Sequence, residues 1–325
     1  MTGNDGVDRF VISKRTTGWG DCLVSAISAW QYARRTRRTL VIDWRRSLYL
    51  DDPQRNAFPA YFEPVTRIGD VPVSSDDTVG DRDYPSPIYE SVGHRALRSL
   101  RSWLATRHLA PSDEQIAAAY YRSHAEEWAL LEQERDRAEP TIVLRCSLSE
   151  GLPDRASCQE FLAALVPRPV IHAEIDRFVR TAFTGVPTVG VHVRYGSRSI
   201  VDTHTPYWLD EEQAIAAICD GIARAAGELG GAPRVFLCTD RRHVLDAIRA
   251  RVPGVITRDK YFQAGGQREL HAWSSRQGLR SDIGRDALVE MFLLAQVDAL
   301  VCYPPHSFFS FYARTCADGP RVQIT

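Results

Sequence analysis

The stretch GVHVRYG, residues Gly190 to Gly196, combines the start of a buried β-strand with two polar side chains near its end. Its small and β-branched residues are typical of a strand that is covered on both faces of a sheet. His192 and Arg194 interrupt this apolar pattern. A guanidinium cannot be neutralised at low cost, so at a strand end it needs solvent or an anion, and its planar fork suits a phosphate. The stretch therefore predicts a strand that carries an anion-binding arginine to one edge of a sheet.

Alternating strand and helix patterns on both sides of this stretch predict an α/β fold. In the second half, helical runs over about 210–228, 241–250 and 285–297 separate the strand-like segments TVGVHVR, RVFLCTD, GVITRD and ALVCYP. This order is that of a doubly wound parallel sheet. In the first half, a strand over Phe10–Ser13, a helix over 21–37 and a strand in TLVIDW form a β-loop-α-β unit. We place the domain boundary near residue 185, which gives domains of residues 1–185 and 186–325.

The middle of the chain is less regular. Residues 73–89 have the turn chemistry of a loop, and a long helix is expected over 112–138, where it opens with the capping-box pattern Ser112-x-x-Gln115. A strand in TIVLRC follows, and then helices over 155–166 and 169–183.

The composition is that of an ordinary globular protein. Hydrophobic residues make up 44% of the 325 residues and charged residues 25%, with a formal net charge of -1, which excludes disorder and a strongly basic nucleic-acid-binding protein. The seven cysteines form no CxxC pair, so we expect reduced core thiols and no zinc site. Without a signal peptide or an apolar run of about 20 residues, a cytoplasmic protein with no transmembrane segment is expected.

Nearly all basic residues of the chain are arginines. The only lysines are Lys14 and Lys260.

Other polar residues stand where further strands of the predicted sheets end. Asp240 ends one strand, and the segment PPHS, which ends at Ser307, joins another strand to its helix. In the first half, the turn Thr17–Asp21 takes the equivalent place. Ligands of open α/β sheets bind at the carboxyl ends of the strands, so a diphosphate held between two α/β units is the candidate ligand. The turn lacks the pattern GxGxxG, which disfavours a nicotinamide dinucleotide.

Each of these residues also has a purely structural interpretation. His192 can be a hydrogen-bonded histidine of the core, Gly18 and Gly20 can serve a tight turn, and Asp240 can cap the next helix.

Glu290 interrupts the apolar run ALVEMFLLA. A carboxylate on such a helix needs a hydrogen-bond partner or solvent. It can accept the two adjacent N–H groups of a guanine base, or it can share a polar stripe with Asp286.

Several long segments resemble the rhizobial nodulation α-1,6-fucosyltransferases, the NodZ family, and more broadly the α-1,6-fucosyltransferases that include the animal core-fucosylating enzyme. The segments are RTTGWGDCLVSAISAWQYARRTRRTLVIDWRRSLYLDDPQRNAFPAYFEP, GVHVRYG, PYW, VFLCTD, ALVEMFLLAQ and PPHSFFSFYAR. The likeness covers about residues 10–325 and is weakest across 73–140. It implies a GT-B-like fold, with two Rossmann-like α/β domains facing across a cleft and GDP-fucose bound chiefly by the C-terminal domain. It also implies inversion at the anomeric carbon, no metal ion and no other cofactor.

The resemblance assigns roles to individual residues. Arg194 corresponds to the family arginine that stabilises the departing β-phosphate, and His192 to a histidine at the nucleotide. Glu290 replaces an aspartate assigned to guanine, Ser307 matches a serine of the phosphate-contacting loop, and Asp240 falls in the third family motif. The donor-binding set is completed by the residues of the glycine-rich turn, Gly18, Trp19, Gly20, Asp21 and Cys22.

The sequence departs from the family directly after Arg194. Rhizobial members continue with a stretch like HGNGED, whereas this chain reads YGSRSI. The next carboxylate is Asp202, ten residues after His192, which is the separation at which the animal enzymes place a glutamate proposed as general base. Asp202 is therefore the first candidate for deprotonating the acceptor, with His204 second. Asp202 can equally end a turn before HTPYW.

The resulting hypothesis is an inverting, metal-independent α-fucosyltransferase that uses GDP-fucose. Its acceptor is left open among an oligosaccharide, a peptide or protein, and a secondary metabolite, and no nucleic acid is expected as a partner. The segments 73–89 and 112–138 lie in the half expected to bind the acceptor. A transferase for another deoxysugar and a catalytically idle nucleotide-binding homologue are the alternatives.

Overall fold

The computed structural model describes residues 8–77, 84–107, 109, 113–132, 136–145, 154–195, 209–262, 279–305, 307–317 and 320–323. Its contacts divide the chain into two compact units. The first unit comprises Met1–Thr17, Asp21–Ser47 and Asp52–Val166, and the second comprises Gly18–Gly20, Leu48–Asp51 and Pro167–Thr325. The units change over between Val166 and Pro167, whereas the sequence pattern placed a domain boundary near residue 185. Gly18–Gly20 of the glycine-rich turn are thus grouped with the C-terminal part of the chain, and Asp21 and Cys22 with the first unit.

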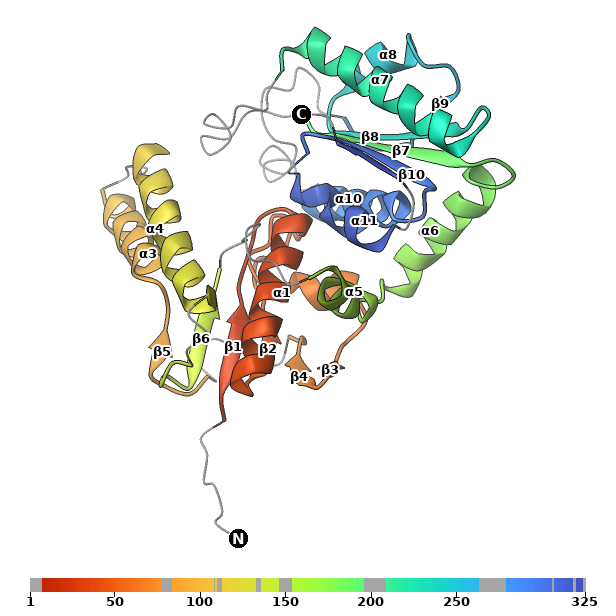
Figure 1. Ribbon diagram of the computed structural model, residues 1–325. Coiled ribbons are helices and arrows are strands. Elements are labelled where there is room, and N and C mark those ends of the chain that lie inside the picture. Colours follow the sequence, from red (N-terminus) through yellow and green to blue (C-terminus); the bar gives the residue numbers. More distant parts are fainter. Residues whose placement is uncertain are drawn as a thin grey trace. The chain divides into compact units, whose positions relative to one another are not determined.

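A mostly parallel sheet forms the centre of the first unit (Figure 1). Its strands lie in the order β3-β4-β2-β1-β6-β5, with β3 antiparallel to β4. The strands are β1 (Phe10–Ser13), β2 (Thr39–Ile42), β3 (Arg67–Ile68), β4 (Val71–Ser74), β5 (Ile88–Tyr89) and β6 (Thr141–Leu144). The helices are α1 (Trp19–Thr36), α2 (Ala57–Tyr61), α3 (Val92–Ala105), α4 (Asp113–Glu132) and α5 (Arg155–Ala163). The three strands predicted in this half are confirmed as the neighbours β2, β1 and β6.

The least regular stretch of the sequence is more ordered than predicted. The stretch 73–89 was predicted as a loop, but its ends join the sheet, where Val73 pairs with Leu40 and Ile88 pairs with Thr141. Only two residues at each end are paired, Val73 and Ser74 of β4 and Ile88 and Tyr89 of β5, which is too few to show a period in the sequence. The helix predicted over 112–138 is present as α4, and α3 was not predicted. Residues 78–83 lie outside the described ranges.

The second unit contains a fully parallel sheet with helices on both faces, so the predicted doubly wound arrangement is confirmed. The strand order is β11-β10-β7-β8-β9. The strands are β7 (Thr188–Val193), β8 (Arg234–Thr239), β9 (Val255–Ile256), β10 (Ala299–Tyr303) and β11 (Arg321–Gln323). Helices α7 (Glu211–Leu229) and α8 (Arg242–Arg249) cover one face. The other face is covered by α6 (Pro169–Ala182), α10 (Arg280–Leu294) and α11 (Phe311–Cys316), the last preceded by the 3-10 helix η2 (Phe308–Ser310) (Figure 1).

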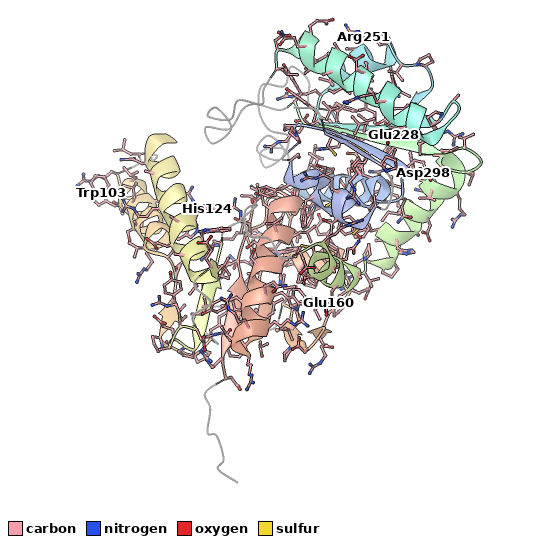
Figure 2. All side chains as sticks on the ribbon, in the orientation of Figure 1. Trp103, His124, Glu160, Glu228, Arg251 and Asp298 are labelled. Atoms are coloured by element: carbon pink, nitrogen blue, oxygen red, sulfur yellow. The ribbon has the colours of Figure 1, made fainter. Side chains whose placement is uncertain are left out.

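Strand β7 lies at the centre of this sheet, and all of its residues are buried. Val189 and Val191 pack into the core beneath α7 and α8, so the alternating residues Gly190 and His192 face the side of α10. Asp298, at the amino end of β10 (Figure 2), accepts the N–H of Thr188 at 2.8 Å and donates its own N–H to the carbonyl of Thr188 at 2.9 Å. This double tie fixes the register of β7 against β10.

The helices and the cysteines of the described ranges were also compared with the predictions from the sequence. Within the described ranges, no helix combines the length and the apolar composition that crossing a bilayer requires. Six cysteines in these ranges carry free thiols, and four of them, Cys22, Cys158, Cys238 and Cys302, are buried.

We predict that Gly190→Ala destabilises the second unit. A Cβ at this position would lie 2.8 and 2.9 Å from the two methyl carbons of Val297 and 3.1 Å from Leu294, and overpacking of this kind costs about 1–3 kcal/mol. Equilibrium unfolding in urea measures the loss. Gly227→Ala is the matched control, because a Cβ on Gly227 of α7 meets no atom within 4 Å and alanine is the better helix former. A Gly190→Ala protein as stable as the unaltered one would contradict this packing.

Candidate functional site

The carboxyl ends of three strands lie level at one edge of the second sheet. Their last residues, Val193 of β7, Thr239 of β8 and Tyr303 of β10, are partners in the sheet register. Arg194 and Asp240 follow directly, so residues predicted from separate stretches start from neighbouring positions. This is the edge at which doubly wound sheets bind their ligands.

His192 is buried beneath this edge and has a relative exposure of 6%. Its ring stacks on Phe309, with the two centroids 4.8 Å apart. Burial and the positive charges of Arg194, Lys260 and Arg314 lower the pKa of His192 from 6.5 to about 3, so the ring is neutral at ordinary pH. Among the described residues, Nδ1 has no hydrogen-bond partner. Within the described ranges, the ring therefore differs from a fully hydrogen-bonded core histidine, because one of its nitrogens is unmatched.

The backbone that carries Arg194 is held by both neighbouring strands. The N–H of Arg194 donates to the carbonyl of Tyr303 at 2.8 Å, and the N–H of Tyr195 donates to Oδ1 of Asp240 at 3.0 Å. Nε of Arg241 donates to the carbonyl of Tyr195 at 3.4 Å. Asp240 does not cap α8, because the N-cap residue of that helix is Arg241. Asp240 instead fixes the chain directly after the half-buried Arg194.

Ser307 lies in the segment between β10 and η2 and is only 3% exposed. Its carbonyl accepts hydrogen bonds from Ser310 at 2.9 Å and from Arg314 at 3.2 Å, and its N–H donates to the carbonyl of Pro304 at 3.2 Å. The Ser307 hydroxyl has no partner within the described part of the chain. The backbone N–H of Ser307 is thus bonded to protein, whereas its hydroxyl is unmatched among the described residues.

The structure brings Gly20 against the segment that follows Ser307. A Cβ on Gly20 would lie 2.0 Å from the carbonyl oxygen of Phe308 and 2.7 Å from the nitrogen of Phe309. Gly20 is therefore needed for a close approach of two backbones, and not for a tight turn alone. Trp19 anchors the same turn, because its Nε1 donates to the carbonyl of Gly284 in α10 at 2.9 Å.

Asp21 and Cys22 belong to the first unit. Asp21 pairs with Arg15 at 3.6 Å, and the buried thiol of Cys22 lies 3.5 Å from the carbonyl oxygens of Arg15 and Thr17. Burial raises the pKa of Cys22, so its thiol stays neutral. These contacts hold the loop after β1 in place.

Glu290 is buried on α10 and is paired with Lys260. Nζ of Lys260 lies 2.7 Å from Oε2 of Glu290, and the two side chains are 7% and 5% exposed. Oε1 of Glu290 has no hydrogen-bond partner among the described residues. Burial raises the pKa of Glu290, and the charge of Lys260 opposes this shift. One turn earlier on the same helix, Asp286 pairs with Arg258 at 3.2 Å. The two carboxylates thus have different cationic partners, and their shared polar stripe remains an alternative interpretation.

Sequence reasoning missed the side chains that complete this edge. Lys260, Arg241, Phe309 and Arg314 contact or polarise the predicted residues. Phe309 and Arg314 stand in the segment PPHSFFSFYAR but were assigned no role, whereas Lys260 and Arg241 stand in none of the segments that resemble the family. Lys260 did carry one signal, because lysine occurs only twice among 40 basic residues.

Part of the predicted site lies outside the described residues. Asp202 and His204, the two candidates for the catalytic base, fall in the gap between Tyr195 and Leu209. In the ranges that are described, no group of three or more His, Cys, Asp or Glu side chains is placed to hold a metal ion.

Comparisons with known proteins point to one family. The profile of the family Nodulation protein Z (NodZ) matches residues 7–322. Nodulation protein Z of Bradyrhizobium diazoefficiens is 38% identical over 323 residues, which are 99% of this chain and 82% of the relative. Nodulation protein Z of Sinorhizobium fredii is 37% identical over 316 residues, which are 97% of this chain and 92% of the relative.

Solved structures agree with this result. NodZ α-1,6-fucosyltransferase soaked with GDP-fucose has a TM-score of 0.74 at 34% identity, over 96% of this chain and 93% of that one. POFUT1 in complex with GDP-fucose has a TM-score of 0.52 at 12% identity, over 97% of this chain and 98% of that one, and shows a likeness of fold alone. The predicted α/β, GT-B-like fold class is confirmed by these matches and by the two parallel sheets.

We predict that the ring signals of His192 in NMR spectra stay constant between about pH 5 and 8, because its pKa is about 3. His192→Gln identifies these signals by their loss. An unfolded histidine titrates near 6.5, so the buried neutral ring contributes stability above that pH, and this contribution is lost as the pH falls toward 3. A titration midpoint near 6.5 would contradict the buried environment.

Proposed function

The chain belongs to the nodulation protein Z (NodZ) family, and on this basis we propose that it transfers fucose from GDP-fucose to an acceptor. The observation that carries the proposal is a set of buried polar atoms in the second unit without partners among the described residues: His192 Nδ1, Glu290 Oε1 and Ser307 Oγ. Leaving a buried polar group unmatched costs about 1–3 kcal/mol. A guanosine diphosphate offers hydrogen-bonding groups that can match all three atoms.

Each part of the donor is assigned to a part of this edge. Glu290 accepts hydrogen bonds from guanine N–H groups, His192 bonds the nucleotide, and the Ser307 hydroxyl donates to a phosphate oxygen. The turn Gly18–Gly20 lines the diphosphate. Support for this arrangement comes from the contact of Gly20 with the backbone directly after Ser307. Asp240 acts one step away, by holding the chain that carries Arg194.

The reaction forms a bond from the acceptor oxygen to C1 of fucose and breaks the bond from C1 to the β-phosphate oxygen. Attack on the opposite face inverts the configuration, and GDP leaves with the bonding electron pair. Negative charge therefore grows on the β-phosphate in an oxocarbenium-like transition state, where a preplaced guanidinium binds more strongly than in the ground state. Arg194 supplies this guanidinium in place of a metal ion. Asp202 takes the proton of the acceptor hydroxyl, and His204 is the second candidate.

The acceptor is assigned to the first unit, which contains the segments 73–89 and 112–138. An oligosaccharide, a peptide or protein, and a secondary metabolite all present the nucleophile that the reaction needs. The relatives named as α-1,6-fucosyltransferases favour a saccharide hydroxyl. The apolar surroundings of the cysteines in the sequence are those of reduced thiols, so we place the reaction in the cytoplasm.

One experiment separates the enzyme from an idle nucleotide-binding homologue. The protein is incubated with GDP-fucose alone and then with candidate acceptors, and mass spectrometry follows release of GDP and a deoxyhexose adduct. An enzyme hydrolyses GDP-fucose slowly and forms the adduct with its acceptor. Binding of GDP-fucose without release of GDP would favour the idle homologue, and turnover of another GDP-deoxysugar in its place would change the donor.

We predict that Arg194→Ala lowers turnover of GDP-fucose by at least about 100-fold, in line with the loss of single charge-stabilising groups. The circular dichroism spectrum and the melting temperature should stay close to those of the unaltered protein. Arg251→Ala removes an exposed arginine that pairs with Glu212 at 2.6 Å, and it serves as the matched control with unchanged turnover. Near-normal turnover by a folded Arg194→Ala protein would overturn the assignment.

We predict that Asp202→Asn lowers kcat for transfer to the acceptor by about 100- to 10,000-fold, the range for loss of a general base. GDP binding should be unchanged, because the base acts on the acceptor. The acid limb of the pH–rate profile should also disappear. If kcat and the profile are both unchanged, Asp202 is not the base, and the same measurement on His204→Gln tests the second candidate.

A further inference from the structure

Lys260 of the second unit is one of only two lysines in the chain. It follows β9 on the carboxyl side of the sheet, and its only hydrogen bond in the described ranges is to Oε2 of Glu290 at 2.7 Å. The ammonium lies 5.3 Å from the centre of the Phe262 ring. It also lowers the pKa of His192, which shows that it contributes to the potential at the nucleotide side of the edge.

The segment that carries Lys260 is tied down on both sides of the sheet edge. The Thr257 hydroxyl donates to the carbonyl of Leu237 in β8 at 2.8 Å. Arg258 donates to the carbonyl of Asp286 at 3.1 Å and pairs with Glu174 of α6. Lys260 therefore approaches Glu290 from a fixed backbone, so the relative position of the ammonium and the carboxylate is set before any ligand binds.

A second lysine–carboxylate pair in the chain shows what is unusual about this one. Lys14 lies 3.0 Å from Oδ2 of Asp43 in the first unit. The other oxygen of Asp43 accepts the N–H of Arg45 at 3.2 Å. Oδ2 accepts no hydrogen bond among the described residues, but it faces the Lys14 ammonium, so each oxygen of that carboxylate lies against a protein group. Glu290 differs, because its Oε1 is buried and has no partner among the described residues. A buried ion pair gives little net stability, and this one leaves an acceptor open beside a cation.

Within the described part of the chain, the ammonium keeps two N–H groups and the carboxylate keeps one oxygen without a partner, so the pair offers a donor and an acceptor side by side. The Watson–Crick edge of guanine offers the reverse order, the acceptor O6 followed by the donors N1–H and N2–H. We infer that Lys260 and Glu290 form a single base-recognition pair, in which Lys260 donates to O6 of the base and Glu290 accepts from N1–H and N2–H. This inference rests on the proposed function, because it names the residue that selects guanine for the same donor site.

The Lys260–Glu290 pair would also explain why the site selects guanine over adenine. Adenine has an amino group at position 6 and a lone pair at N1. Its amino group, a hydrogen-bond donor, would face the Lys260 ammonium, and its N1, an acceptor, would face the Glu290 carboxylate. Sites whose buried polar groups are left unmatched reject such analogues strongly. Hypoxanthine keeps O6 and N1–H and lacks only the 2-amino group, so it should bind between guanine and adenine.

The test compares the dissociation constants of GDP, IDP and ADP by titration calorimetry. The unaltered protein should prefer GDP to ADP by at least about 100-fold, with IDP between them. Lys260→Met keeps the length of the side chain and removes the charge, and it should reduce the GDP-to-ADP preference by at least about tenfold. Lys14→Met removes the other lysine–carboxylate pair and should leave the preference unchanged. A folded Lys260→Met protein with the preference of the unaltered protein overturns the inference.

If the Lys260→Met protein does not fold, the inference is tested by changing the ligand instead of the protein. The unaltered protein is titrated with 2,6-diaminopurine riboside 5′-diphosphate, which keeps the 2-amino group of GDP and replaces O6 with an amino group. Binding at least about tenfold weaker than that of GDP supports the pair, and equal binding contradicts it. The proposed function is tested separately by release of GDP from GDP-fucose. If the protein releases GDP but its preference for GDP does not depend on Lys260, only this inference is contradicted.

Discussion

The burial of β7 on both faces is the constraint on which the donor side of the molecule depends. Its valines fill one face, and Gly190 allows α10 to approach the other. The register fixed by Asp298 then brings the ends of β7, β8 and β10 level. Polar residues from three distant stretches meet at this edge because their strands end together.

The electrostatics of this edge suit a diphosphate before any ligand is bound. Arg194, Lys260 and Arg314 all contribute positive potential at His192, and together with burial they hold its pKa at about 3. A histidine in this place is neutral at ordinary pH, so in the proposed site it can offer a hydrogen bond but no charge. The cations carry the charge, and backbone ties from Asp240 and Tyr303 keep one of them in position. The site therefore separates hydrogen bonding from charge stabilisation.

Much of the fold could be predicted from the sequence, because buried parallel strands are apolar runs of recognisable length. The short edge strands β3 and β5 could not, since each has only two residues, too few to show a hydrophobic period. At the site, His192, Arg194, Glu290 and Ser307 stood out as polar residues in apolar surroundings. Lys260 did not, because its role depends on a loop that Arg258 anchors to α10, and such a contact across 28 residues has no local signal.

The central claim is that the second unit is built for a guanosine diphosphate donor. Thermal unfolding in the presence of GDP-fucose, GDP-mannose, a UDP-sugar and NAD tests it most directly, because a ligand that binds only the folded state raises stability by about 2.7 kcal/mol at 100 times its Kd. The account predicts a higher melting temperature with both guanosine ligands and the largest rise with GDP-fucose. A rise with NAD or the UDP-sugar, and none with GDP-fucose, would contradict it.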